Sequence, residues 1–294
     1  KGFSFHSEVP WAPLVLWPPA DADHLLVSSD QMLALEREWL ASGLPVAALM
    51  ETVGQRMADW FLDREELLSS GVVVLVGPGH NGGDGLVVAR KLLEANVDVR
   101  VWAPMPLRQA LTQEHWRHLI WLGASVLPSS PDPAGRDLWI EALFGLGQTR
   151  PLPVDLADLF SRRQRDSPGR LVSLDVPAGL DSDTGCPMQG GAAFAAHTLC
   201  VGLIKCGLVQ DAALAHVGSL QRIDPAVPLS LTQSLSSPAK LRVLADDIAS
   251  LPSPAEAAGA TKYQRGRLLL VAGSDRYRGA AHLVVRGALA SGAG

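Results

Sequence analysis

The sequence predicts an α/β fold, with helices covering both faces of a doubly wound, mainly parallel, Rossmann-like sheet. Between residues 72 and 175, short apolar segments of strand length alternate with longer segments of helical periodicity. The predicted strands lack polar alternation, as expected when helices bury both faces of a sheet. Several of them run into loops rich in Gly, Pro or Asp, and ligands of such folds bind at the carboxyl ends of the strands.

The composition argues against several classes of function. The chain has 294 residues, 47% hydrophobic content and a net charge of −5, so we expect a folded protein without a basic surface for nucleic acid. The three cysteines lack the spacing of a zinc site, which favours a reducing compartment. No apolar run approaches the ~20 residues that span a bilayer. We therefore expect a cytoplasmic protein with neither nucleic-acid nor membrane partners.

The N-terminal part is expected to hold an arm and two helices. Prolines interrupt residues 1–28, which should form an extended arm. Ser29 is a suitable N-cap for a helix that ends at Gly43. A second helix should follow from about Pro45 to Asp63.

The alternating part follows. Expected strands cover 72–76, 97–102, 124–127, 138–143 and 171–175, and expected helices cover 84–95, about 109–122 and 154–163. The arginine-rich segment 161–166 is expected to be a solvated helix end.

The composition changes after residue 224. Ser, Pro, Ala and Leu dominate residues 225–262, which indicates a linker between a domain at 29–224 and a second domain beginning at 263–294. The second domain should open with a strand, a glycine loop and a helix. Because the chain starts at Lys1 and ends at Gly294 within a helical pattern, we expect it to be part of a longer polypeptide.

The turn after the first strand of the alternating part contains G-x-G-x-x-G, formed by Gly77, Gly79 and Gly82. An NAD-dependent oxidoreductase would need an acid at the end of the next strand, about 20 residues on, to bind the ribose hydroxyls. Trp102 occupies that region instead, and Asp98 lies near the start of the strand. The missing acid argues against hydride transfer.

The same turn carries more polar groups than a tight turn requires. Asn81 and Asp84 lie among glycines that allow a ligand to approach the backbone closely. We expect Asp84 to cap the following helix or to bind hydroxyl groups. His80 is the one histidine of the chain in a sequence context that suggests function.

Two further loops carry candidate residues. Asp175 ends an apolar strand, and the turn at Pro177 and Gly179 should leave its carboxylate at the sheet edge, where it could act as a general base. Asp181 is expected to cap an Asx-turn. In the loop at 145–151, Gly145 and Gly147 allow flexibility, and Thr149 or Arg150 are candidates for a phosphate contact.

Four motifs together resemble one family. They are "LMETVG" (residues 49–54), "GPGHNGGDGLVVAR" (77–90), "EALFGLG" (141–147) and "LDVPAGLDSDTG" (174–185). In this order and spacing they resemble the YjeF N-terminal domain, the NAD(P)H-hydrate epimerase, over about residues 29–224. The tail from about residue 241 resembles the start of a ribokinase-like, ADP-dependent NAD(P)H-hydrate dehydratase, as in the bifunctional nicotinamide nucleotide repair enzymes.

The resemblance implies interconversion of the R and S forms of NADHX and NADPHX, with Asp175 as catalytic acid or base. The implied substrate-binding residues are His80, Asn81, Gly82, Gly83, Asp84, Gly145, Leu146, Gly147, Gln148, Thr149, Arg150, Pro151 and Asp175. It also implies a homodimer. The dehydratase part would use ADP or ATP with magnesium, and its catalytic motifs would lie beyond Gly294.

The family's potassium site maps to Asn81, Glu141 and Ala178. Here Glu141 replaces an aspartate, and Ala178 replaces a serine whose hydroxyl is lost. His80 replaces the first asparagine of the family's Asn-Asn-Gly-Gly motif. These departures keep an alternative open, a catalytically weak dinucleotide-binding or scaffold module of the same fold.

Overall fold

The computed structural model describes residues 18–235, 240–249 and 268–292. The chain divides into two compact units, one through Arg242 and one from Val243. In the second unit the described elements are helices α9 (Ala245–Ala249) and α10 (Arg278–Ala290). The expected helix is therefore confirmed, but Leu268–Val271 forms no strand. A strand needs paired neighbours to be stable.

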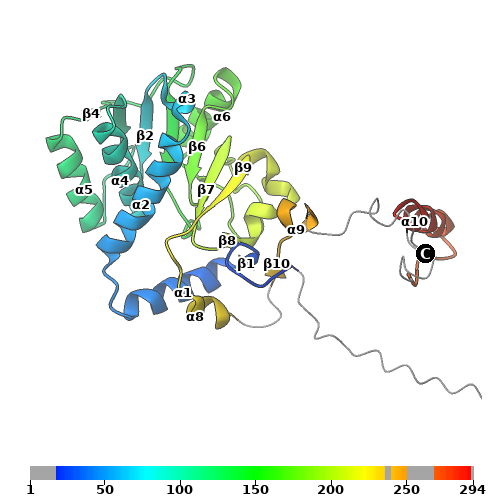
Figure 1. Cartoon of the computed structure of the whole chain (residues 1–294). Helices are drawn as coiled ribbons and strands as arrows, with labels where there is room; N and C mark the ends of the chain where they lie inside the picture. The colour runs from blue at the N-terminus through cyan, green and yellow to red at the C-terminus, as the bar shows by residue number, and fades with distance from the viewer. Residues whose placement is uncertain (1–17, 236–239, 250–267, 293–294) are drawn as a thin grey trace, which may run out of the picture. The chain divides into compact units, whose positions relative to one another are not determined.

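The first unit is built on a seven-stranded parallel sheet with strand order β4-β3-β2-β5-β6-β7-β9 (Figure 1). Its strands are β2 (Val72–Val76), β3 (Val99–Trp102), β4 (Ser125–Val126), β5 (Leu138–Ala142), β6 (Leu171–Leu174), β7 (His197–Val201) and β9 (Ser219–Ile223). The chain winds outward from β2 in one direction and from β5 in the other. Ligands of doubly wound sheets bind where the strand order reverses, which here is the gap between the loops after β2 and β5.

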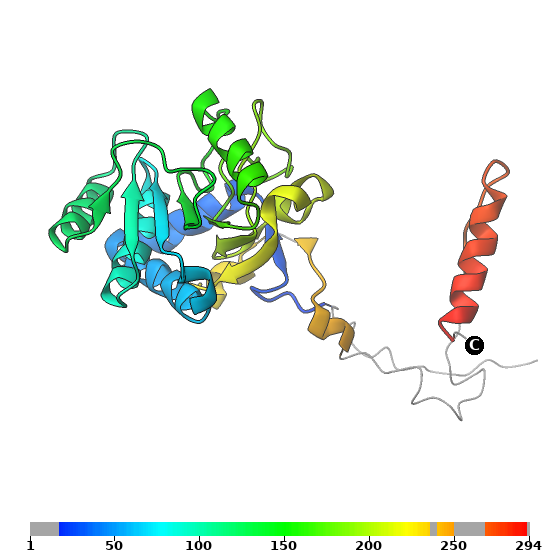
Figure 2. The same cartoon turned by 90° about the horizontal axis from the view of Figure 1, so that it is seen from above.

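Helices bury both faces of the sheet, as the unalternating strands predict. Val72, Val74 and Val76 face one core, and Val73 and Leu75 face another. The first core is covered by α2 (Val46–Leu62), α4 (His80–Glu94) and α5 (Ala110–Trp121), and the second by α6 (Val154–Asp166). Figure 2 shows α2 and α6 on opposite sides of the strands. The predicted fold class is confirmed.

The start of α6 is exposed to solvent, but its arginine-rich end contains one buried arginine. Arg163 is 1% exposed. Its guanidinium lies 4.4 Å from the ring centroid of Trp139 and donates to the carbonyls of Pro133, Gly135, Asp137 and Arg170. The expectation of a wholly solvated 161–166 segment was wrong, because four backbone carbonyls at the amino-terminal edge of β5 and β6 need a donor.

A second, three-stranded sheet has the order β10-β1-β8. β1 (Leu25–Val27) pairs in parallel with β8 (Ile204–Lys205) and antiparallel with β10 (Lys240–Leu241). The extended arm therefore ends before β1, and the first unit extends beyond 224 through β10. Residues 1–17 of the expected arm and 250–267 of the expected linker lie outside the described residues.

The remaining elements of the first unit are short. They are α3 (Glu65–Leu68), α7 (Leu214–Val217), α8 (Leu229–Gln233) and two 3₁₀ helices at Cys206–Val209 and Asp211–Ala213. Within the described residues, no helix is long and apolar enough to cross a membrane.

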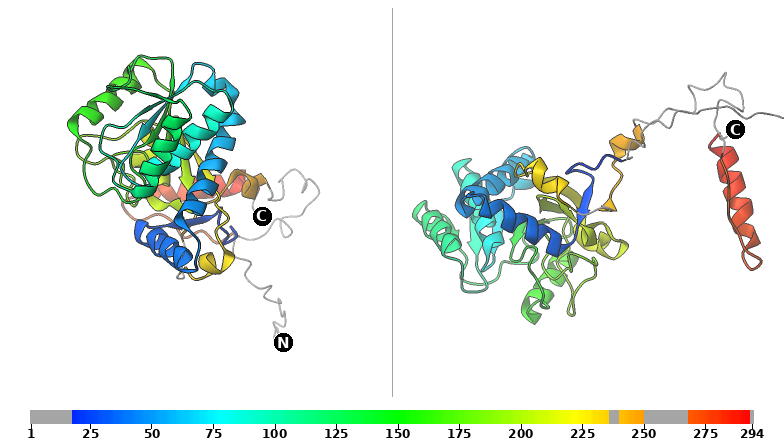
Figure 3. Two further views of the ribbon diagram at one scale, coloured as in Figure 1. Left: turned by 90° about the vertical axis from the view of Figure 1, so that its left-hand side faces the viewer. Right: turned by 90° about the horizontal axis from the view of Figure 1, so that it is seen from below.

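Helix α1 (Ser29–Ala41) is positioned by its cap and by one apolar cluster. Ser28, one residue before the expected N-cap, accepts from the amide of Gln31, and Gln31 accepts from the amide of Ser28. Met32 and Leu35 pack against Leu203 and Leu231 of the main body. Figure 3 shows α1 beside α8.

We predict that Ser28→Ala lowers the free energy of unfolding by about 1 kcal/mol, because the alanine leaves helix amides without an acceptor. Urea denaturation measures the change. Ser69→Ala is the control, because the Ser69 hydroxyl is exposed and donates only to Glu66 of its own helix. Equal effects of the two substitutions would contradict the assigned cap.

Candidate active site

The glycines of the first turn serve packing more than ligand access. A Cβ at Gly77 would overlap the carbonyl of Leu143, and one at Gly82 would overlap the carbonyl of Gly77. A Cβ at Gly83 would collide with the side chain of Met50. Helix α4 begins at His80 and not at residue 84, so Asn81 to Asp84 form its first turns. Gly77 therefore lets the turn approach the loop after β5 closely, and Gly83 lets α4 approach α2.

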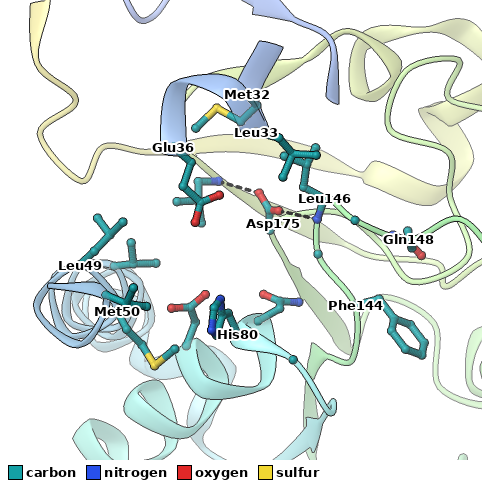
Figure 4. Close-up of a pocket in the computed structure, with 18 of the residues that line it drawn as sticks. Met32, Leu33, Glu36, Leu49, Met50, His80, Phe144, Leu146, Gln148 and Asp175 are labelled. Carbon is teal, nitrogen blue, oxygen red and sulfur yellow. Dashed lines mark hydrogen bonds between the residues drawn. The ribbon is translucent and has the colours of Figure 1, made fainter. Parts of the chain in front are cut away.

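A cavity of about 360 Å³ lies at the switch point of the sheet. Side chains of α1 and α2, the start of α4, the loop after β5, Asp175 and Lys205 line it (Figure 4). Its volume falls at the small end of the range of about 300–1,000 Å³ for ligand pockets.

The structure brings most of the predicted site residues to this cavity. His80, Asn81, Asp84, Gly145, Leu146, Gly147, Gln148 and Asp175 line it. Gly82 and Gly83 are buried in helix packing, and Thr149, Arg150 and Pro151 are exposed outside the lining. Glu141 and Ala178 are fully buried and also lie outside the lining.

Asp175 follows β6 directly and has a φ of 67°. Aspartate and asparagine adopt this left-handed conformation more readily than other residues with a side chain. Its Oδ2 accepts from the amide of Leu146 at 3.0 Å, and its Oδ1 accepts from the amide of Val201 at 3.2 Å. The carboxylate is thus fixed between the loop after β5 and the end of β7, with its edge toward the cavity.

Lys205 is the residue that sequence reasoning missed. Its ammonium group donates to Asp175 Oδ1 at 2.6 Å and to the carbonyl of Val201 at 2.8 Å, and its side chain is 1% exposed. Burial alone lowers the pKa of Lys205, but the interactions of its ammonium group with Asp175 and Cys200 together outweigh burial and raise the pKa above its usual range. The lysine is therefore a fixed positive charge behind Asp175.

Two more carboxyl groups face the cavity without such a partner. Among the described residues, the carboxyl groups of Glu36 and Asp84 form neither a hydrogen bond nor an ion pair. Burial raises the pKa of Asp84 well above its usual value, and Asp175 and Glu36 raise it further. Burial likewise raises the pKa of Glu36, with an added effect of Asp175. Asp84 does not cap α4, contrary to one of our two expectations, because α4 begins four residues earlier.

The loop after β5 is held to the Asp175 segment by Gln148. Its amide nitrogen donates to the carbonyl of Pro177 at 3.1 Å, and its oxygen accepts from the amide of Gly179 at 2.7 Å. Gly179 has a φ of 82°, as the expected sharp turn requires. Asp181 accepts from the amides of Asp183 and Thr184, which confirms the expected Asx-turn.

A model of the YjeF-related protein N-terminus matches residues 46–207. This chain belongs to that family. The matched range contains β2 to β8, and with them Asp175, Lys205 and both loops that frame the cavity. Glu36 lies outside it.

Curated relatives of this YjeF-family chain share one name. A bifunctional NAD(P)H-hydrate repair enzyme of Gloeobacter violaceus is 40% identical over 277 residues, covering 92% of this chain and 54% of the relative. That of Synechocystis is 39% identical over 272 residues, covering 92% and 52%. The chain spans about half the length of these relatives. The crystal structure of yeast ynu0 matches this chain with a TM-score of 0.60 at 21% identity. The match covers 74% of this chain and 99% of the yeast chain, and it supports the fold.

The potassium ligands implied by the family fit this site in part. Oδ1 of Asn81 is buried and has no hydrogen-bond partner within the described chain, so it offers a free oxygen. Glu141 is fully buried and accepts from the amides of Leu143 and Ala178. Ala178 offers no side-chain oxygen, and its carbonyl already accepts from Ala193. Asn81 and Glu141 each carry a buried side-chain oxygen of the kind that binds a cation, whereas Ala178 does not.

Proposed function

We propose that this chain carries the epimerase activity of an NAD(P)H-hydrate repair enzyme and interconverts the R and S forms of NADHX and NADPHX. The observation that carries the proposal is the Asp175–Lys205 pair at the cavity, set in a chain of the YjeF family. The names of the relatives support the choice of substrate.

The reaction inverts the configuration of the hydrated carbon of the nicotinamide ring. Its C–O bond breaks as the hydroxyl takes up a proton and leaves as water, and the lone pair of the ring nitrogen forms a C=N bond. Water then adds to the other face and gives one proton to a carboxylate. Asp175 is held with Lys205 in an orientation suited to accept or return this proton.

Competing functions predict different observations. A binding module of the same fold would bind the dinucleotide without accelerating R-to-S exchange. An oxidoreductase would need a ribose-binding acid, but β3 ends at Trp102 and Asp98 precedes the strand. We predict that the protein accelerates exchange, followed by chromatography of the two forms, without producing NADH absorbance from NAD. A protein that binds and does not accelerate would support the binding module.

We further propose a potassium ion held by Asn81 and Glu141, where it would supply fixed positive charge near the loops that bind substrate. Burial raises the pKa of Glu141 to about 7, so the carboxyl gains its negative charge only as the pH rises through that value. Cation binding should therefore strengthen between pH 6 and pH 8.

We predict that replacing sodium by potassium at pH 8 raises the melting temperature by about 2–4 °C, the effect of roughly 1 kcal/mol of binding energy. The shift should shrink at pH 6 and vanish in Asn81→Ala, which loses the free oxygen. Thermal melting measures it. An equal shift at both pH values and in the variant would contradict an ion bound by these two residues.

The activity of the whole repair enzyme is a wider proposal. The resemblance of the tail to the dehydratase suggests that the longer protein dehydrates the S form with ADP or ATP and magnesium. A homodimer is proposed on the same basis. Light scattering tests the dimer, and ADP-dependent recovery of NADH tests dehydration.

A further inference from the structure

The cavity is strongly negative for its size. Glu36, Asp84 and Asp175 contribute carboxyl groups, while Lys205 is the only lysine or arginine in the described lining. His80, at the exposed mouth, is the remaining titratable group there. Because Lys205 pairs directly with Asp175, Glu36 keeps only longer-range attraction to Lys205 and His80, and Asp84 forms no ion pair among the described residues, so both charges are left largely uncompensated.

Glu36 reaches the cavity from outside the region matched by the family model. Its side chain extends from α1 toward Asp175 and lies across the cavity from His80 (Figure 4). The capped start of α1 and the packing of Met32 and Leu35 fix its position. The fold of the first unit therefore fixes the position of Glu36 at the cavity.

Two partly buried carboxyl groups without partners are costly in a folded protein. The cost falls when a ligand supplies positive charge or hydrogen-bond donors. Apart from Glu36, the residues of α1 and α2 that line the cavity, including Leu33, Leu49 and Met50, are apolar. A flat ring that bears positive charge would match both the apolar walls and the uncompensated carboxylates.

We propose that this cavity prefers a positively charged nicotinamide ring over a neutral one, and that Glu36 is a specificity-determining residue for that preference. The proposal rests on the proposed function, whose ring intermediate carries a positive charge on the C=N unit. The oxidised ring of NAD has the same charge and is flat. NAD should therefore bind more tightly than NADH, which has a neutral ring and is otherwise the same molecule.

Calorimetric titration of the whole chain with NAD and with NADH tests this preference. We expect NAD to bind about tenfold more tightly at pH 8, and Glu36→Gln to reduce the ratio about threefold or more, the scale of one charge in a partly buried site. Contacts with the rest of the dinucleotide are common to NAD and NADH, so they cancel in the ratio of the two affinities. Glu38→Gln is the matched control, because Glu38 lies on the same helix, is exposed and does not line the cavity.

The ratio of the affinity for NAD to the affinity for NADH should also depend on pH. Lowering the pH neutralises Glu36 and Asp84, whose pKa values are raised, so NAD should lose its advantage as the solution becomes more acidic. Melting curves of both glutamine variants check that they fold.

Equal affinities for NAD and NADH in the unmodified protein, no binding of either at millimolar concentration, or an unchanged ratio in Glu36→Gln would each overturn the proposal. R-to-S exchange is measured separately. A chain that accelerates exchange without preferring NAD refutes the ring-charge proposal alone, and one that prefers NAD without exchange refutes the epimerase alone.

Discussion

Replacing Asp175 by asparagine should slow R-to-S exchange by about 10²–10⁴-fold, the usual contribution of a positioned acid or base. The amide of asparagine can neither accept nor return the proton of the leaving and attacking water. Chromatography of NADPHX forms at fixed protein concentration measures the loss. Exchange at the normal rate would refute the role of Asp175.

Asparagine is the sharpest substitution at this position because it separates chemistry from backbone geometry. It tolerates the φ of 67° and keeps one of the two oxygens that accept from the amides of Leu146 and Val201. Asp181→Asn is the control, because Asp181 lies in the same segment and holds only its own turn. It should leave the exchange rate unchanged within about twofold, since it retains the turn acceptor.

Lys205→Met should lower both the stability of the protein and the rate of exchange. Removing one partner of a buried ion pair costs about 3–5 kcal/mol, because the other charge stays buried without compensation. Without the ammonium group, the Asp175 carboxylate loses the 2.6 Å contact that helps to hold its orientation, so exchange should slow.

Urea denaturation and chromatography of the NADPHX forms test these two effects. The double variant Asp175→Asn with Lys205→Met should lose less stability than the sum of the single losses, because it leaves no isolated charge. Additive losses of stability and an unchanged exchange rate in Lys205→Met would show that the pair is not coupled as the 2.6 Å contact implies.

The sequence allowed the sheet and much of the site to be predicted because both depend on local patterns. Unalternating valines predicted a strand buried on both faces, and the structure confirms this for β2. Asp175 was recognisable because it directly follows an apolar strand. Its role in catalysis stays a prediction, as do the roles of the other site residues.

Other features depend on contacts between distant segments. Lys205 lies 30 positions after Asp175, in a short strand that is placed by pairing with β1, which we expected to be irregular. Glu36 resembles any polar residue of an amphipathic helix until the packing of α1 aims it at the cavity. Arg163 likewise matched a solvated helix end until the carbonyls around it were known.

The measurement that tests the central claim most directly is R-to-S exchange of NADPHX with and without this chain, in potassium and then in sodium buffer. The account predicts clear acceleration that is lost in Asp175→Asn and retained in Asp181→Asn. No acceleration in either buffer by a protein shown to be folded would contradict the epimerase assignment.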